Sequence, residues 1–249
     1  MFANKVVIVT GGSAGIGAVT AEYFAKEGAA VTVVGRNETK LKNVAERIEK
    51  LGAKVLIIKA DVSKEDEAAT IVKQTVDKFG KLDILVNNAG IVRTAKIDEN
   101  TALAVYDEVM NTNIRSVVQI TNLAAPYLKE TKGNIVNISS VAGIKVPFIG
   151  MGAYAISKAS MDHFTRATAT DLAPYGVRVN SINPGPVATE IFQTFEIPAA
   201  MLQSPDSVTL LNPMSEASEI ADLILYVASD KARSITGSCY VIDNGMLLK

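Results

Sequence analysis

The chain has 249 residues and nearly balanced charges, with 25 Lys and Arg against 26 Asp and Glu. This balance excludes a global field that would attract nucleic acid or an anionic membrane, so we expect a small-molecule partner and no nucleic acid. The N-terminus lacks a secretory signal pattern, and no apolar stretch reaches the roughly 18 to 20 residues that span a bilayer. We expect a cytoplasmic protein without a membrane span, in which the lone Cys239 is a buried structural thiol.

The first part of the chain alternates short β-branched runs with amphipathic helical stretches. This pattern is typical of parallel strands joined by crossover helices. The expected strands span residues 5–10, 30–34, 55–59 and 82–86. Between the second and third strands, Leu41, Val44, Ile48 and Leu51 recur at helical spacing and predict an amphipathic helix.

The alternation continues to the C-terminal residues. It predicts a long helical region over 102–128, helices over 154–173 and 215–229, and strands over 134–138, 178–182 and 239–242. The fold class is therefore α/β, a single Rossmann-type domain over 1–249 with a doubly wound parallel sheet of about seven strands and helices on both faces. The stretch 184–213 has no clear period, and we expect residues 186–213 to form a mobile substrate lid.

A glycine-rich turn follows the first strand. Gly11, Gly12, Gly15 and Gly17 lie where missing side chains let a pyrophosphate approach the backbone and the helix N-terminus. The spacing differs from G-x-G-x-x-G, and such turns also serve only to join a strand to a helix. The turn alone leaves both interpretations open.

The second strand ends at Gly35 and Arg36, without the carboxylate that binds the adenosine ribose of NAD. A planar guanidinium suits a 2′-phosphate, so the sequence favours NADP(H) over NAD(H), the alternative being a solvated loop arginine. After the third strand, Asp61 is expected either to accept a hydrogen bond from adenine or to cap the next turn. Val62 is expected to pack on the adenine ring.

Tyr154 and Lys158 are four residues apart in a predicted helix. Residues at this spacing face the same way, so we expect the Lys158 ammonium to lie beside the Tyr154 phenol and to lower its pKa from the ordinary value of about 10. The sequence therefore indicates a proton-transfer group.

Together these motifs resemble the short-chain dehydrogenase/reductase family across essentially the whole chain. The similar segments are 10–17, Asp61, 87–90, Asn113, Ser140, Tyr154 with Lys158, and 184–185. The resemblance implies that Tyr154 is the general acid for carbonyl reduction or the base for alcohol oxidation, and that Ser140 hydrogen-bonds the substrate oxygen. Ser139 is a rival for Ser140, because both hydroxyls lie at a strand end and alternate residues point opposite ways.

Asn113 is implied to hold a helix irregularity and a water that relays protons to Lys158; the alternative is an ordinary polar helix residue. Lys158 is also implied to bind the nicotinamide ribose, and Thr189 the carboxamide. The full set of expected cofactor contacts is Gly11, Ser13, Gly15, Ile16, Gly17, Arg36, Asp61, Val62, Asn88, Ala89, Gly90, Tyr154, Lys158, Pro184, Gly185, Val187 and Thr189.

The residues expected around the substrate, beside Ser140 and Tyr154, are predominantly apolar. They are Val92, Ile144, Val146, Phe148, Met151, Ile191, Phe192 and Phe195. A lipophilic ketone or secondary alcohol fits such a set best. A Cys/His cluster is missing from the sequence, so no metal site is expected. The family's usual Asp-Gly-Gly is replaced by residues 243–245, Asp-Asn-Gly, with little expected effect on catalysis.

The expected function is hydride transfer between a nicotinamide cofactor, NADPH favoured, and a carbonyl or secondary alcohol substrate. The alternative is a dinucleotide-binding regulator or scaffold without turnover, and a second rival is an NAD-dependent enzyme of the same fold. By analogy with the family, a homo-oligomer, a dimer or tetramer, is expected to form through the helices at 102–128 and 154–173.

Overall fold

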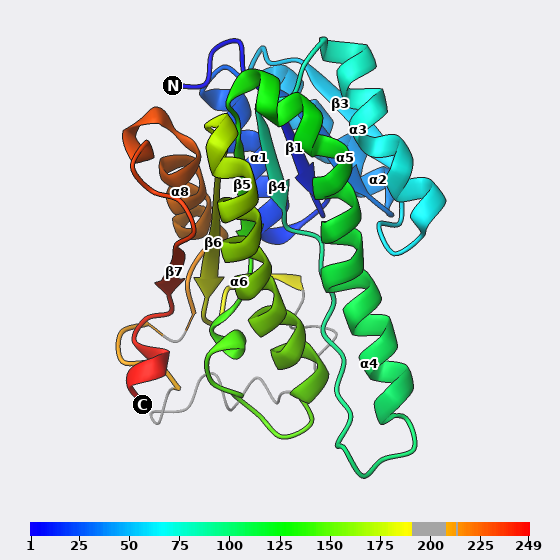
Figure 1. The fold of residues 1–249 in the computed structure, drawn as a ribbon, viewed down its shortest axis with the longest axis vertical. Coiled ribbons are helices and arrows are strands. Elements are labelled where there is room, and N and C mark those ends of the chain that lie inside the picture. The colour runs from blue at the N-terminus through cyan, green and yellow to red at the C-terminus, as the bar shows by residue number, and fades with distance from the viewer. Residues whose placement is uncertain (191–207, 213) are drawn as a thin grey trace.

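The protein is described by a computed structural model that covers residues 1–190, 208–212 and 214–249. Within these residues, parallel strands form one seven-stranded sheet in the order β3-β2-β1-β4-β5-β6-β7 (Figure 1). The strands are β1 (Val6–Thr10), β2 (Ala30–Gly35), β3 (Val55–Lys59), β4 (Ile84–Asn87), β5 (Asn134–Ile138), β6 (Arg178–Pro184) and β7 (Cys239–Ile242). The predicted doubly wound α/β sheet is confirmed.

Helices cover both faces of the sheet, because alternate strand residues point to opposite sides. Val7 and Val9 of β1 pack on one side with α1 (Gly15–Lys26), α2 (Glu38–Lys50) and α8 (Ala217–Ala228). Ile8 packs on the other side with α3 (Glu65–Phe79), α5 (Ser116–Thr131) and α6 (Gly152–Leu172). Figure 1 shows α5 and α6 together in front of the sheet. The central strands β1, β4 and β5 are therefore buried on both faces.

The long helical region predicted over 102–128 is present but irregular. It consists of α4 (Ala102–Met110), a π-helical turn over Asn111–Arg115, and α5. Short 3-10 turns follow several other elements, at Val141–Gly143, Ala173–Tyr175, Asp230–Ala232 and Met246–Leu248. The π-helical turn matters for the site, because it contains Asn113.

The chain reverses the direction in which it builds the sheet between β1 and β4. Open α/β sheets bind ligands outside the carboxyl ends of their strands at such a point. Here Thr10 joins the two strand ends, since its Oγ1 accepts hydrogen bonds from the backbone N–H groups of Asn88 at 3.0 Å and Ala89 at 3.1 Å. The topology thus places the glycine turn and the Asn88 segment against each other.

Cys239 is only half-buried, because β7 is the last strand of the sheet and has a neighbour on one side only, so the expectation of a buried thiol was wrong.

Most of the expected lid at 186–213 lies outside the described residues, and its mobility stays a prediction. Among the helices that the structure describes, none is both long enough and apolar enough to span a membrane.

Candidate active site

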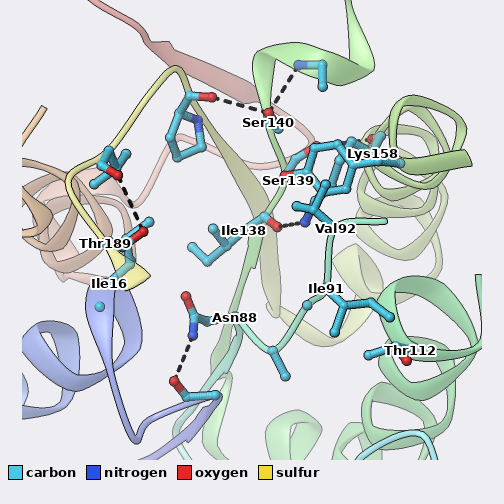
Figure 2. Close-up of a pocket in the computed structure, with 18 of the residues that line it drawn as sticks. Ile16, Asn88, Ile91, Val92, Thr112, Ile138, Ser139, Ser140, Lys158 and Thr189 are labelled. Carbon is cyan, nitrogen blue, oxygen red and sulfur yellow. Dashed lines mark hydrogen bonds between the residues drawn. The ribbon is translucent and has the colours of Figure 1, made fainter. Parts of the chain in front are cut away.

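A pocket with a cavity volume of about 420 Å³ opens at the carboxyl ends of the strands. Volumes of about 300 to 1,000 Å³ are typical of small-molecule sites. Figure 2 shows Ile16 and Thr189 on one side of the pocket and Val92 and Lys158 on the other. The pocket therefore lies between α1 and α6, across the point where the sheet reverses.

The glycine turn forms one wall of the pocket, and its backbone passes close to Asn88. Gly11 has a φ of +65°, and a Cβ on Gly17 would lie 2.3 Å from the Gly11 carbonyl oxygen and 2.4 Å from Asn88 Nδ2. That nitrogen donates to the carbonyl oxygens of Thr10 at 2.9 Å and Gly11 at 3.2 Å. Larger side chains would push helix and strand apart.

The N-terminus of α1 borders the pocket without a side-chain cap. Ala14, the N-cap residue, makes no capping side-chain hydrogen bond, and Gly15 and Ile16 of the first turn line the pocket. Uncapped backbone N–H groups at a helix N-terminus are a binding site for phosphate. The residues at this wall therefore fit the pyrophosphate of a dinucleotide.

Arg36 and Asp61 also line the end of the pocket at which the glycine turn lies. The Arg36 side chain is 68% exposed, and its Nη1 lies 3.8 Å from Asp61 Oδ2. Ser63 donates to Asp61 Oδ1 from its backbone N at 3.0 Å and its Oγ at 2.7 Å, so Asp61 caps the following turn. Burial raises the pKa of Asp61, but the Ser63 hydrogen bonds and the Arg36 charge outweigh it and hold the pKa below the usual value. Asp61 thus stays ionised beside an exposed cation.

The other end of the pocket holds Ser140 after β5. Its Oγ accepts a hydrogen bond from Ala142 N at 3.1 Å and lies 3.4 Å from the Pro184 carbonyl oxygen, to which it donates. The neighbouring Ser139 instead donates from Oγ to the Lys158 carbonyl oxygen at 3.0 Å and is buried. Since the Ser139 hydroxyl is held against α6, Ser140 is the serine whose hydroxyl is better placed for a ligand.

Tyr154 and Lys158 line the same pocket from α6. Lys158 Nζ lies 5.5 Å from the centroid of the Tyr154 ring and donates to the Ile138 carbonyl oxygen at 2.8 Å. Burial raises the pKa of Tyr154 to about 12, although the hydrogen bond with Ser140 lowers it. Burial also lowers the pKa of Lys158 to about 8, against the opposing effect of Asp162.

The predicted lowering of the Tyr154 pKa by Lys158 was therefore wrong for the protein alone. The two residues do share one face, as the spacing predicted, but desolvation of the phenol dominates its ionisation. At neutral pH the phenol is protonated, which suits a proton donor.

Asn113 lies in the π-helical turn and is fully buried. Its Oδ1 accepts from Ile91 N at 2.8 Å, and its Nδ2 donates to Ile91 O at 2.9 Å and to Ser157 Oγ at 3.1 Å. The predicted helix irregularity is present at this residue. Asn113 thereby ties the segment after β4 to α6, one residue before Lys158.

The pocket brings together most of the residues that the sequence singled out. Its lining includes Gly11, Ser13, Gly15, Ile16, Arg36, Asp61, Val62, Asn88, Ala89, Gly90, Val92, Ser140, Phe148, Met151, Tyr154, Lys158, Pro184, Gly185, Val187 and Thr189. Gly17 and Asn113 lie behind this lining and support it. Ile191, Phe192 and Phe195 lie outside the described residues.

Two expected substrate contacts, Ile144 and Val146, are not part of the pocket lining among the described residues. They are 57% and 58% exposed, in the segment between the 3-10 turn at Val141–Gly143 and the lining residue Pro147. Sequence reasoning also missed lining residues that carry no motif, among them Ile91, Thr112, Pro147, Glu190 and Met246. Met246 follows the last strand, and only the position of β7 beside β6 could have indicated that this residue lines the pocket.

Comparison with known proteins adds relatives over nearly the full length. The family model described as enoyl-(acyl carrier protein) reductase matches residues 11–247. A 3-oxoacyl-[acyl-carrier-protein] reductase of Thermotoga maritima is 35% identical over 98% of both chains. A cyclopentanol dehydrogenase of a Comamonas species is 36% identical over 97% of this chain and 96% of its own.

The solved structures agree with this result. A short chain dehydrogenase from Burkholderia cenocepacia, in complex with NADP, superposes with a TM-score of 0.92 at 35% identity and covers 99% of each chain. The chain is thus an oxidoreductase that belongs to the short-chain dehydrogenase/reductase family.

Proposed function

We propose that this protein is an NADPH-dependent reductase of lipophilic ketones, which also runs in reverse on secondary alcohols. One observation carries the proposal: Ser140, Tyr154 and Lys158 line one end of a pocket whose other end has the glycine turn and Arg36. A dinucleotide with its pyrophosphate at α1 would span these two ends. The relatives, named as reductases and dehydrogenases, give no support to a regulator without turnover.

NADP(H) is favoured over NAD(H) because of the charge at the adenosine end. The exposed Arg36 guanidinium offers planar donors to a 2′-phosphate, whereas Asp61 is engaged with Ser63. The Burkholderia structure in complex with NADP is consistent with this preference. When bound, the nicotinamide ring supplies a hydride to a carbonyl carbon or accepts one from an alcohol carbon.

Proton transfer is assigned to Tyr154. Its raised pKa of about 12 keeps the phenol protonated at neutral pH, so that it can donate to a carbonyl oxygen as the carbon gains a hydride. The Ser140 Oγ–H donates to the same oxygen and stabilises the charge that develops there. Lys158, with a pKa of about 8, exchanges protons near neutrality and returns one to the tyrosinate.

The substrate is proposed to be apolar around its carbonyl group. Val92, Phe148 and Met151 line the catalytic end, and Val92 and Met151 are buried there. Apolar walls favour a lipophilic compound and exclude water from the reacting carbon.

A single domain and self-association are also proposed. The sheet takes its strands from residues 6 to 242, which supports one domain. Leu103 of α4 is 72% exposed and Ile156 of α6 is 49% exposed, which supports a homodimer or homotetramer that buries these two helices.

The test is NADPH oxidation with a panel of apolar ketones. We expect turnover by the wild type, and Tyr154→Phe to lower kcat by about 10²- to 10⁴-fold, because the proton donor is lost. Tyr226→Phe, at a half-exposed tyrosine of α8, is the matched control and keeps full activity. The proposal would be contradicted if the wild type oxidised NADPH with none of the ketones, or if it oxidised none of the secondary alcohols with NADP⁺.

A further inference from the structure

The turn at Met246–Leu248 contributes a side chain to the pocket. Met246 lines it, and the turn follows β7 directly. Gly185 N donates to Ile242 O at 2.9 Å, so this part of the chain runs beside the end of β6, next to the Ser140 segment. Arg36 follows β2, at the opposite side of the sheet. Met246 therefore belongs to the catalytic end and not to the adenosine end.

The backbone that carries Met246 is held by Asp243. This buried carboxylate accepts hydrogen bonds from Gly245 N and Leu247 N, each at 2.9 Å. Gly245 has a φ of +78°, and a Cβ there would come within 3.0 Å of the Leu210 side chain. Hydrogen bonds on both sides of Met246 hold the turn in place, and position 245 leaves no room for a side chain.

Asn244 links this turn to Leu210, Leu211 and Ser215. Its φ is +53°, in the left-handed region, which asparagine tolerates better than most residues with a side chain. Its carbonyl oxygen accepts from Leu210 N at 2.8 Å and Leu211 N at 3.1 Å, and its Nδ2 donates to Ser215 Oγ at 3.0 Å. The two hydrogen bonds to the backbone carbonyl oxygen depend only on the conformation of the turn, whereas the hydrogen bond to Ser215 requires the asparagine side chain.

Ser215 in turn is joined to the pocket wall after β6. Its backbone N donates to Pro186 O at 2.9 Å, and its carbonyl oxygen accepts from Ala188 N at 2.9 Å. Pro186 and Val187 line the pocket. One hydrogen-bonded chain thus runs from the Met246 turn through Asn244 and Ser215 to the wall at Pro186 and Val187.

We propose that Met246 is a specificity-determining residue that limits the size of the substrate, and that Asn244 is a positioning residue that holds it through Ser215. The inference rests on the proposed carbonyl reduction and adds a wall that selects for compact apolar substrates. A thioether on a fixed turn fills space at the catalytic end, and its removal opens room for additional methylene groups.

The experiment compares cyclopentanone with cyclooctanone as substrates, both with NADPH. In Met246→Ala, the ratio of kcat/KM for the larger ring to that for the smaller ring is expected to rise by about tenfold or more. Leu248→Ala is the matched control, because Leu248 lies in the same turn and is 81% exposed. An unchanged ratio in Met246→Ala, with turnover intact, overturns this inference and leaves carbonyl reduction standing.

Asn244→Gly tests the positioning role, because glycine accepts the left-handed φ and keeps the backbone acceptor while removing only the Ser215 bond. Ser215→Ala removes the same bond from the other side. Both variants are expected to move the ratio in the same direction as Met246→Ala, through a lower KM for cyclooctanone, with kcat for cyclopentanone unchanged. Wild-type ratios in both variants contradict the role of Asn244.

A readout that does not need turnover separates this inference from the proposed function. Cyclooctanone is titrated by calorimetry into the NADP⁺-loaded wild type and Met246→Ala. A several-fold lower Kd in the variant supports the size limit even if no ketone is reduced. Equal or weaker binding in the variant overturns it.

Discussion

Lys158 Nζ donates a hydrogen bond of 2.8 Å to the backbone carbonyl oxygen of Ile138 at the end of β5. The bond holds a buried ammonium against the sheet, at the catalytic end of the pocket. Burial of this charge disfavours the protonated form, which lowers the pKa of Lys158 to about 8. A lysine that would otherwise stay charged thereby titrates near neutral pH.

The first prediction concerns the pH dependence of reduction. Below its pKa of about 8, Lys158 is protonated and supports Tyr154 as a donor; above it, the charge is lost. We expect kcat/KM for ketone reduction to fall as the pH rises through about 8, as measured in steady-state assays from pH 6 to 10. A flat profile up to pH 10 would contradict this role of Lys158.

Asp162 is expected to set the pH at which kcat/KM falls, that is, the position of the alkaline limb of the pH profile. Its carboxylate is buried one turn after Lys158 and accepts hydrogen bonds from Ser181 Oγ at 3.1 Å and Asn183 Nδ2 at 2.7 Å. Its charge raises the pKa of Lys158 against burial. Asp162→Asn removes the charge, so the limb is expected to move to lower pH.

The matched control for that variant is Asp171→Asn, at an exposed position of the same helix. Burial raises the pKa of the Cys239 thiol on β7, and the charges of Asp162 and Arg166 act on that thiol in opposite directions. The limb should stay near pH 8 in Asp171→Asn. If Asp162→Asn loses activity evenly at all pH values, Asp162 has only a structural role.

Arg36→Asp is expected to change the cofactor preference. The substitution replaces a charged donor for the 2′-phosphate by a carboxylate, and charged hydrogen bonds contribute about 1.5 to 3 kcal/mol. The Kd for NADPH should rise by about 10- to 100-fold, whereas that for NADH should not rise. Fluorescence titration measures both, with Lys50→Asp at the far end of α2 as control. A wild-type preference for NADH would refute the cofactor assignment.

Gly17→Ala is expected to destabilise the protein and weaken cofactor binding together. The added Cβ would lie 2.3 Å from Gly11 O, a backbone atom that cannot move without shifting the turn. Overpacking of this kind lowers the free energy of unfolding by about 1 to 3 kcal/mol. Gly152→Ala, where nothing lies within 4 Å of the new Cβ, should have little effect in the same urea titration.

The sequence alone determined the alternation of strands and helices and the motif residues. Apolar periods of two kinds along the chain are local properties, so the parallel sheet followed from them. The resemblance to the family favoured Ser140 over Ser139, and the structure agrees, because the Ser139 hydroxyl is held against α6. The shared face of Tyr154 and Lys158 followed from helical spacing in the same way.

Only the tertiary structure decided the ionisation of those two side chains and the membership of the pocket. Desolvation depends on atoms from several strands and helices, so spacing along α6 could not reveal that burial moves both pKa values away from their ordinary range. Met246 reaches the catalytic end because β7 pairs with β6, whereas Ile144 and Val146, much closer to Tyr154 in sequence, face solvent. The residue types that carry the chemistry can be recognised along the chain, whereas strand pairing brings those residues close together in space.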